Sequence, residues 1–107
     1  MKIYSGTRAG AGGQRVQVEV GTRITTLNPR TDLWNHSPTG FEWGYSGSGP
    51  AQLALALLAD ATGDDRLAFH LHQPFKCHFV SSFGYSWTLT EAEILAWVKS
   101  KMEDVAS

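Results

Sequence analysis

The chain has 107 residues, of which 42% are hydrophobic and 11% aromatic, and its formal net charge at pH 7 is −1. This length and composition fit one globular domain and exclude an intrinsically disordered protein. The charge argues against a nucleic-acid binder held mainly by phosphate contacts. The single cysteine, Cys77, excludes an internal disulfide, and the N-terminus lacks the apolar run of a secretion signal, so we expect a cytoplasmic protein.

The N-terminal quarter of the chain predicts antiparallel strands. Residues 2–7 form a short predicted strand that leads into a glycine-rich loop with glycines at positions 10, 12 and 13. Residues 15–20 alternate strictly between polar residues and valines, which places the three valines on one face of a strand. A glycine-threonine turn at 21–22 and the β-branched residues of 23–27 then predict a hairpin.

A long loop and a short strand are predicted next. Residues 28–40 contain two prolines and several turn-forming polar residues, and Leu33 and Trp34 can pin this loop to the core. Residues 41–45 predict a short strand that carries Trp43 on one face.

The clearest helix of the sequence follows, and it is predicted to be buried. Pro50 suits the first turn of a helix, and the serine or glycine before it suits an N-cap. Between residues 51 and 61 only Gln52 and Asp60 are polar, so the helix has no stripe that could face solvent. Gly63 ends it after about a dozen residues, which is too short for a membrane span.

The C-terminal part predicts two more helices and a strand. Asp64-Asp65 can cap a second, shorter helix that Pro74 stops, and the alternation in residues 75–80 predicts a strand. Thr90 and Glu93 form a capping box at the start of an amphipathic last helix, which Trp87 and Leu89 anchor. The predicted fold is therefore α+β, a single domain over residues 1–107. In it, an antiparallel sheet of N-terminal strands plus one later strand packs on a buried central helix and a C-terminal amphipathic helix.

The glycine-serine turn before the central helix is the first candidate site. Helix-start N–H groups favour anions, and Gly44 and Gly49 have the spacing of a phosphate-binding loop. However, Pro50 and Ala51 replace the lysine and hydroxyl of that motif, and Gln52 stands where a dinucleotide fingerprint needs its third glycine. The same residues also nearly reproduce the serine-nucleophile motif G-x-S-x-G, but its last glycine is missing. The two remaining interpretations are a tight structural turn and a small anion or nucleotide site.

Two other groups consist of residue types that occur both in binding sites and in purely structural roles. Tryptophan and tyrosine dominate binding hot spots, so the aromatic residues near the turn form either a recognition surface or part of the core. They are Trp34, Trp43 and Tyr45. Zinc-ligand residue types occur at His70, His72, Cys77 and His78. Their spacing is not that of a zinc site and their predicted directions diverge, so we expect no metal and no cofactor.

The segment of residues 41–56, together with Phe75-Lys76 and with Trp87 before the last helix, resembles a family of small proteins of unknown function. Its members occur in bacterial genomes and in phages or prophages. The resemblance spans roughly residues 3–98 and is sharpest in the glycine-serine turn. It implies a phage or mobile-element setting and no particular activity.

Our leading hypothesis is a small non-enzymatic protein that docks on a host or viral macromolecule, and inhibition of a host defence system is a narrower form of it. We expect a protein partner, no membrane, and no preference for nucleic acid. The candidate binding residues are Trp43, Gly44, Tyr45, Ser46, Gly47, Ser48 and Gly49. The alternative is a nucleotide- or anion-binding protein, with or without catalysis, that uses the same turn. The oligomeric state stays open.

Overall fold

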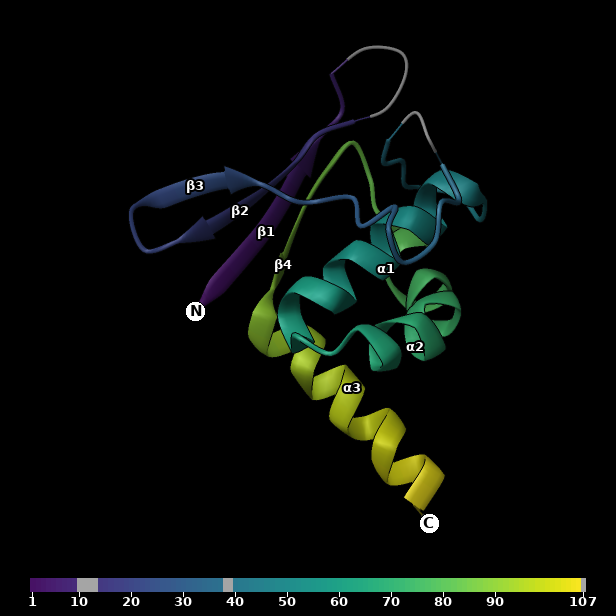
Figure 1. The fold of residues 1–107 in the computed structure, drawn as a ribbon. Coiled ribbons are helices and arrows are strands. Elements are labelled where there is room, and N and C mark those ends of the chain that lie inside the picture. Colours follow the sequence, from purple (N-terminus) through teal and green to yellow (C-terminus); the bar gives the residue numbers. More distant parts are fainter. Residues whose placement is uncertain (10–13, 38–39, 107) are drawn as a thin grey trace.

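The computed structural model describes residues 1–9, 14–37 and 40–106, and the predicted glycine loop at positions 10, 12 and 13 lies outside the described residues. The fold is α+β, with a four-stranded antiparallel sheet and helices packed against one of its faces (Figure 1). The elements are β1 (Lys2–Thr7), β2 (Val16–Val20), β3 (Arg23–Thr26), α1 (Ser48–Thr62), α2 (Asp65–His78), η1 (Val80–Ser82), β4 (Ser86–Thr90) and α3 (Glu91–Ala106).

The sheet has the strand order β3-β2-β1-β4, and each neighbouring pair is antiparallel. Tyr4 in the central strand β1 lies opposite Val18 of β2 and Leu89 of β4, and all three side chains are buried against the helices. The other face of the sheet carries polar side chains such as Ser5 and Gln17. This two-sidedness follows from the alternation that the sequence shows in β2.

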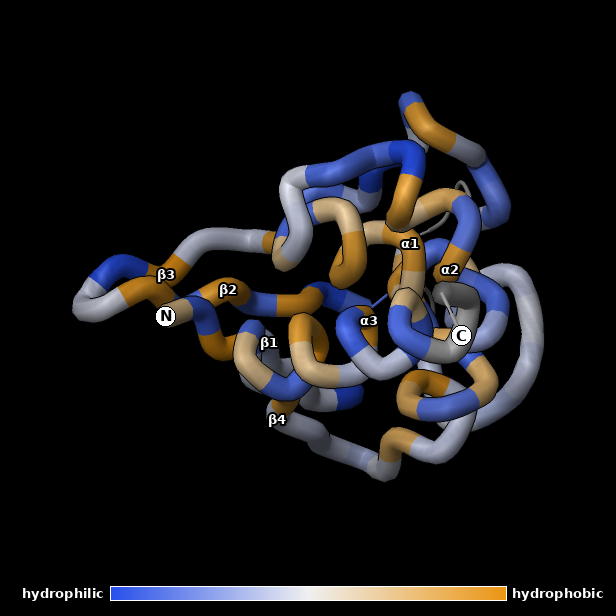
Figure 2. Tube along the Cα trace, turned by 90° about the horizontal axis from the view of Figure 1, so that it is seen from below, coloured by the Kyte–Doolittle hydropathy of each residue, from blue (hydrophilic) through white to orange (hydrophobic). Residues whose placement is uncertain are grey.

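The predicted β2–β3 hairpin is confirmed, and its far end projects beyond the helices (Figures 1 and 2). Val16 and Val18 are buried as expected, whereas Val20 is exposed because it lies where the hairpin leaves the body of the protein. All four residues of β3 are exposed for the same reason.

The predicted buried helix is also confirmed, as α1, which lies between the sheet and α2 (Figure 1). Every residue from Gly49 to Ala59 is buried. Gly63 ends the helix in the left-handed conformation, with φ of 68°, and its N–H donates to the Ala59 carbonyl over 3.0 Å. Across the described residues, none of the helices has the length and apolarity needed to cross a membrane.

The second helix is longer than predicted, and the prediction of a strand over residues 75–80 is wrong. Asp64 caps α2 as expected, but the helix passes through Pro74 and ends at His78. The buried residues of α2 are Ala68, His72 and Phe75, which recur at helical spacing. The stabilisation from burying this face outweighs the cost of Pro74 inside the helix. Pro74 is exposed and interrupts the hydrogen bonding of one turn only.

The prediction of a short strand over residues 41–45 is wrong as well. Phe41 makes only an isolated bridge with Gln14, and both Phe41 and Trp43 are buried. Gly44 adopts a φ of 87°, outside the range of a strand, and this turns Tyr45 out to solvent.

The later strand of the sheet is not residues 75–80 but β4, which was not predicted from the sequence and which pairs with β1. Its sequence alternates polar and apolar residues, and the apolar Trp87 and Leu89 are buried, so they belong to a strand as well as anchoring α3. The capping box is confirmed, because the Glu93 N–H donates to Thr90 Oγ1 over 3.1 Å and the Thr90 N–H donates to Glu93 Oε1 over 3.1 Å.

Candidate functional site

Trp43, the first of the predicted binding residues, is part of the core. Its side chain is 1% exposed, and its indole N–H donates to the Gly84 carbonyl over 2.8 Å. Its ring packs edge-on against Trp87, with centroids 5.6 Å apart, and the Arg8 guanidinium lies 5.1 Å from the ring centroid. The sequence allows this tryptophan either to form a recognition surface or to fill the core. In the structure it fills the core.

The glycines of the turn allow close packing. Gly44 has the positive φ noted above, and its N–H donates to the backbone carbonyl of the first η1 residue over 3.0 Å. A Cβ added at Gly49 would lie 2.6 Å from Glu42 Cβ, and one added at Gly47 would lie 2.6 Å from the Tyr45 ring. The turn is thus a tight connection in which the chain passes close to its neighbours.

The remaining predicted residues lie on the surface at the start of α1. Tyr45 is 51% exposed, and Ser46 and Ser48 are exposed. The N-cap residue, Gly47, has no side chain to accept a hydrogen bond from the first turn, whose N–H groups have no acceptor within the helix. This is the arrangement that an anion site at the helix start would use.

A second set of aromatic side chains gathers where the loop after β3 meets α2. We call Trp34, His36, Phe69 and His72 the aromatic-histidine cluster. Ring centroids are 5.8 Å apart for Trp34 and Phe69, 5.7 Å for Trp34 and His36, and 5.6 Å for Phe69 and His72. Trp34 is 51% exposed and Phe69 is 42% exposed. The cluster therefore shows two large aromatic side chains to solvent while the histidine rings pack against them.

Gln52 positions the loop side of the cluster. This side chain is fully buried in α1, where its Oε1 accepts from the backbone N–H groups of His36, over 2.7 Å, and Ser37, over 3.2 Å. Its Nε2 donates to the Pro29 carbonyl over 2.6 Å. A loop without strand partners needs such acceptors for its backbone. Gln52, one of two polar residues in an apolar stretch, therefore fixes where the segment from Trp34 to Ser37 crosses α1.

Arg30 fastens the same loop to the start of α2. Its guanidinium donates to Asp32 Oδ1 over 3.0 Å and to Asp65 Oδ2 over 2.9 Å. The hydrogen bond from Arg30 lowers the pKa of the Asp32 carboxyl, and the bonds to both carboxylates raise the pKa of Arg30. Gln52 of α1 thus holds the loop on both sides of Trp34 in the sequence, and Arg30 adds an attachment to α2.

His36 and His72 are joined by a hydrogen bond. Their Nε2 atoms are 3.0 Å apart, and His72 Nδ1 lies 2.6 Å from the Phe69 carbonyl oxygen. Because a carbonyl oxygen only accepts, neutral His72 carries its proton on Nδ1, and its Nε2 accepts from His36 Nε2. Burial is the main cause that lowers the pKa of both rings, and the positive charge of Lys76 lowers both further.

The predicted zinc-ligand types do not converge in the described structure. Within residues 1–9, 14–37 and 40–106, no three histidine, cysteine, aspartate or glutamate side chains are placed to hold one metal ion. His72 faces His36 from the other side of the cluster, whereas Cys77 is exposed. Sequence reasoning missed His36. The available signal was the helical spacing of His72 with Ala68 and Phe75, which puts a histidine on a buried face where it needs a partner.

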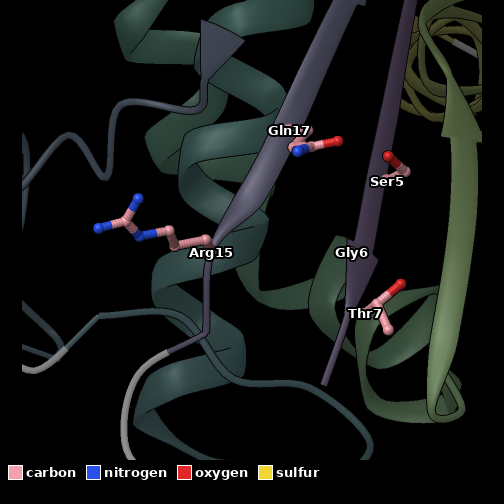
Figure 3. A pocket seen from close by; sticks show the side chains of 5 residues that line it. All are labelled: Ser5, Gly6, Thr7, Arg15 and Gln17. Atoms are coloured by element: carbon pink, nitrogen blue, oxygen red, sulfur yellow. The ribbon is translucent and has the colours of Figure 1, made fainter. Parts of the chain in front are cut away.

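The surface has two hollows whose lining residues do not form a catalytic arrangement. A depression of about 210 Å³ on the open face of the sheet is lined by Ser5, Gly6, Thr7, Arg15 and Gln17 (Figure 3). The Arg15 side chain extends away from the hydroxyl groups of Ser5 and Thr7. An apolar hollow of about 260 Å³ lies between α2 and α3. Neither pairs a nucleophile with a base.

Comparisons with known proteins give a family and no function. No curated protein and no solved structure matches the chain. One family model matches residues 4–100, which run from β1 into the second half of α3. Its description is "Family of unknown function (DUF6166)". The predicted resemblance to a family of unknown function is therefore confirmed, and the chain belongs to DUF6166.

Proposed function

We propose that this chain is a small non-enzymatic binding protein of phage or mobile-element type that docks on a host or viral protein through Trp34 and Phe69. Inhibition of a host defence system is the narrower form of this proposal. The observation that carries it is that both aromatic side chains are about half exposed although each packs against other rings.

Ordered, exposed aromatic side chains are well suited to binding. Association costs free energy for every side chain that it immobilises, so rings that are already held in place lose less on docking. Trp34 is held by Phe69 and His36, and the backbone beside it is held by Gln52. The cluster therefore offers a large apolar contact area at low entropic cost, which is the physical profile of a binding hot spot.

The chemistry of the cluster indicates what the partner presents. Trp34 and Phe69 are apolar, and Arg30 of the same loop is already paired with two carboxylates, which leaves Lys76 as the cation whose charge acts on the histidines of the cluster. A partner with an apolar pocket for one or both rings fits this surface better than a polyanion, which would need unpaired cations. Tyr45 is exposed and keeps its predicted role as a contact residue, whereas Trp43 supports the fold.

A nucleotide or anion at the start of α1 is the second candidate. The observation in its favour is that Gly47 provides no side-chain cap for the first-turn N–H groups. This candidate uses Ser46, Gly47, Ser48 and Gly49 instead of the aromatic-histidine cluster.

Capture from native host lysate tests the proposal and separates the two candidates. Tagged wild-type protein, Trp34→Ala, Phe69→Ala and the control Tyr85→Ala, which alters another exposed aromatic residue, are compared after circular dichroism has shown that each is folded. We expect one stoichiometric protein partner, with capture reduced about tenfold or more by either cluster variant and unchanged by the control.

Two outcomes would count against docking through the cluster. Equal capture by wild type and both cluster variants would remove Trp34 and Phe69 from the interface. A small-molecule mass excess in native mass spectrometry of the purified protein, with no protein partner, would favour the helix-start site instead.

A further inference from the structure

The hydrogen bond between His36 and His72 depends on how many protons the pair carries. In the neutral pair, His72 Nδ1–H donates to the Phe69 carbonyl and His72 Nε2 accepts from His36 Nε2–H. One added proton can enter at His36 Nδ1 and leave this bond intact. A second proton has to enter at His72 Nε2, and two N–H groups would then face each other across 3.0 Å.

The surroundings of the pair oppose its charging. His72 is buried in α2, where Lys76 on the next turn adds a positive charge, and the Gln73 side-chain nitrogen lies 3.4 Å from His72 Nε2. From α1, the pair is faced by the neutral Gln52. In the described part of the chain, the charges that act on the two rings are those of Lys76 and of the rings themselves. The hydrogen bond from His72 Nδ1–H to the Phe69 carbonyl favours the charged ring, but burial has the larger effect and the pKa of His72 is lowered.

The carboxylates nearest in sequence to this region are engaged elsewhere. Asp32 and Asp65 both bind Arg30 at the other attachment of the loop. His70, on the same helix as His72, packs against Phe69 from the edge, with ring centroids 6.1 Å apart.

We propose that the His36–His72 pair is an acid-sensitive latch that holds Trp34 and Phe69 in one arrangement at neutral pH and opens when both rings are protonated. Its biological meaning, that acid weakens docking, rests on the proposed function. The latch itself is a property of the free protein.

Opening of the histidine pair is local, because the hydrogen bonds that Gln52 and Arg30 make to hold the loop do not depend on the protonation of the two rings. Gln52 still accepts from the backbone N–H groups of His36 and Ser37, and Arg30 still binds Asp65. The rings of His36 and Trp34 therefore turn away from α2 while the backbone of the loop stays attached. The expected change is in the environment of Trp34, without unfolding of the protein.

The pH window follows from the direction of the pKa shifts. Both histidines have a pKa below the ordinary value of 6.5 in the closed cluster. In the open or unfolded state, the rings take up protons at about pH 6.5, so that state binds more protons below this pH. The closed arrangement is fully stable above 6.5 and loses stability as the pH falls from there through the lowered pKa values.

Fluorine NMR of protein labelled with 5-fluorotryptophan tests the latch. The chain has four tryptophans, and the buried Trp43 and Trp87 serve as internal references. Trp97 is not used as a reference because its ring packs against His78, with centroids 6.0 Å apart. Between about pH 7.5 and 5, we expect the Trp34 resonance to shift with a midpoint below 6.5 while those of Trp43 and Trp87 stay in place. The shift should be smaller in His72→Gln, where His36 is still present beside Trp34, and should persist in full in the matched control His70→Gln, which changes an exposed histidine of the same helix.

A titration of the histidine rings in ¹⁵N-labelled wild-type protein gives a second readout that needs no variant. The latch is contradicted if His36 and His72 titrate at or above 6.5, if Trp34 does not respond to pH, or if Trp34 responds equally in His72→Gln. Because none of these measurements involves a partner, a working latch with no captured protein would refute the proposed function alone.

Discussion

The glycine-serine turn and the aromatic-histidine cluster differ in how they use their residues. The turn has the more distinctive sequence, yet Trp43 fills the core and a side chain at Gly49 would collide with Glu42. The cluster is inconspicuous in the sequence, yet it exposes Trp34 and Phe69. A distinctive local pattern therefore reflects tight packing at least as readily as function, because close backbone approach restricts residue type more strongly than a surface contact does.

The two regions also differ in what holds them. The turn is fixed by close contacts within residues 42–49 and by two hydrogen bonds to the chain at and after η1, from the Gly44 N–H and from the Trp43 indole. The cluster is assembled from two distant segments, which are held together by the buried amide of Gln52 on the loop backbone and by the ion pair of Arg30 with Asp65. Substitutions in the turn should therefore affect the stability of the whole protein, and substitutions at the exposed positions of the cluster should affect it little.

Replacing each of two tryptophans by alanine gives the largest expected contrast. Trp43→Ala should lower the free energy of unfolding by about 3–5 kcal/mol, since it leaves a large cavity in the core beside Trp87 and Gly6. Trp34→Ala should cost about 1 kcal/mol, because the ring is half exposed and loses mainly its contacts with Phe69 and His36. Urea denaturation of both variants measures the difference. Equal losses would mean that the two tryptophans do not differ in structural role.

The buried amide below the cluster gives the next largest effect. Gln52→Leu keeps most of the side-chain volume but removes the acceptor for the His36 N–H and the donor to the Pro29 carbonyl, at a cost of about 2–3 kcal/mol. The control is Gln17→Leu, on the open face of the sheet, which should change stability by less than about 0.5 kcal/mol. Urea denaturation gives the two values, and hydrogen exchange should show faster exchange at His36 in Gln52→Leu alone. Unchanged protection there would show that Gln52 does not hold the loop.

The parts of the fold that the sequence predicts correctly are those decided by local signals. The alternation in β2, the all-apolar run of α1 and the capping box at Thr90 each depend on residues within one element. The strand predicted over 75–80 is wrong because that stretch also fits the helical spacing of Ala68 and Phe75, and packing on α1 decides between the two periods.

The cluster could not be predicted from the sequence. His36 and His72 are far apart in the chain, and their meeting depends on the path of a loop that Gln52 and Arg30 set through tertiary contacts. Exposure of Trp34 and burial of Trp43 likewise follow from packing, since each tryptophan has a polar residue directly beside it in the sequence. Residue type alone allows each tryptophan to lie on a recognition surface or in the core, and it does not decide between the two.

The smallest predicted effect concerns why the turn contains glycine. Gly49→Ala places a methyl group against Glu42, and the strain of about 1–3 kcal/mol exceeds the gain of about 1 kcal/mol that alanine brings to a helix. We expect a net loss of about 1 kcal/mol in urea denaturation. Gly84→Ala is the matched control, because a Cβ there meets no atom within 4 Å, and it should be neutral or stabilising by a few tenths of a kcal/mol. If Gly49→Ala were instead as stable as Gly84→Ala, close packing would no longer explain this glycine, and the anion site at the start of α1 would become the stronger interpretation of the turn.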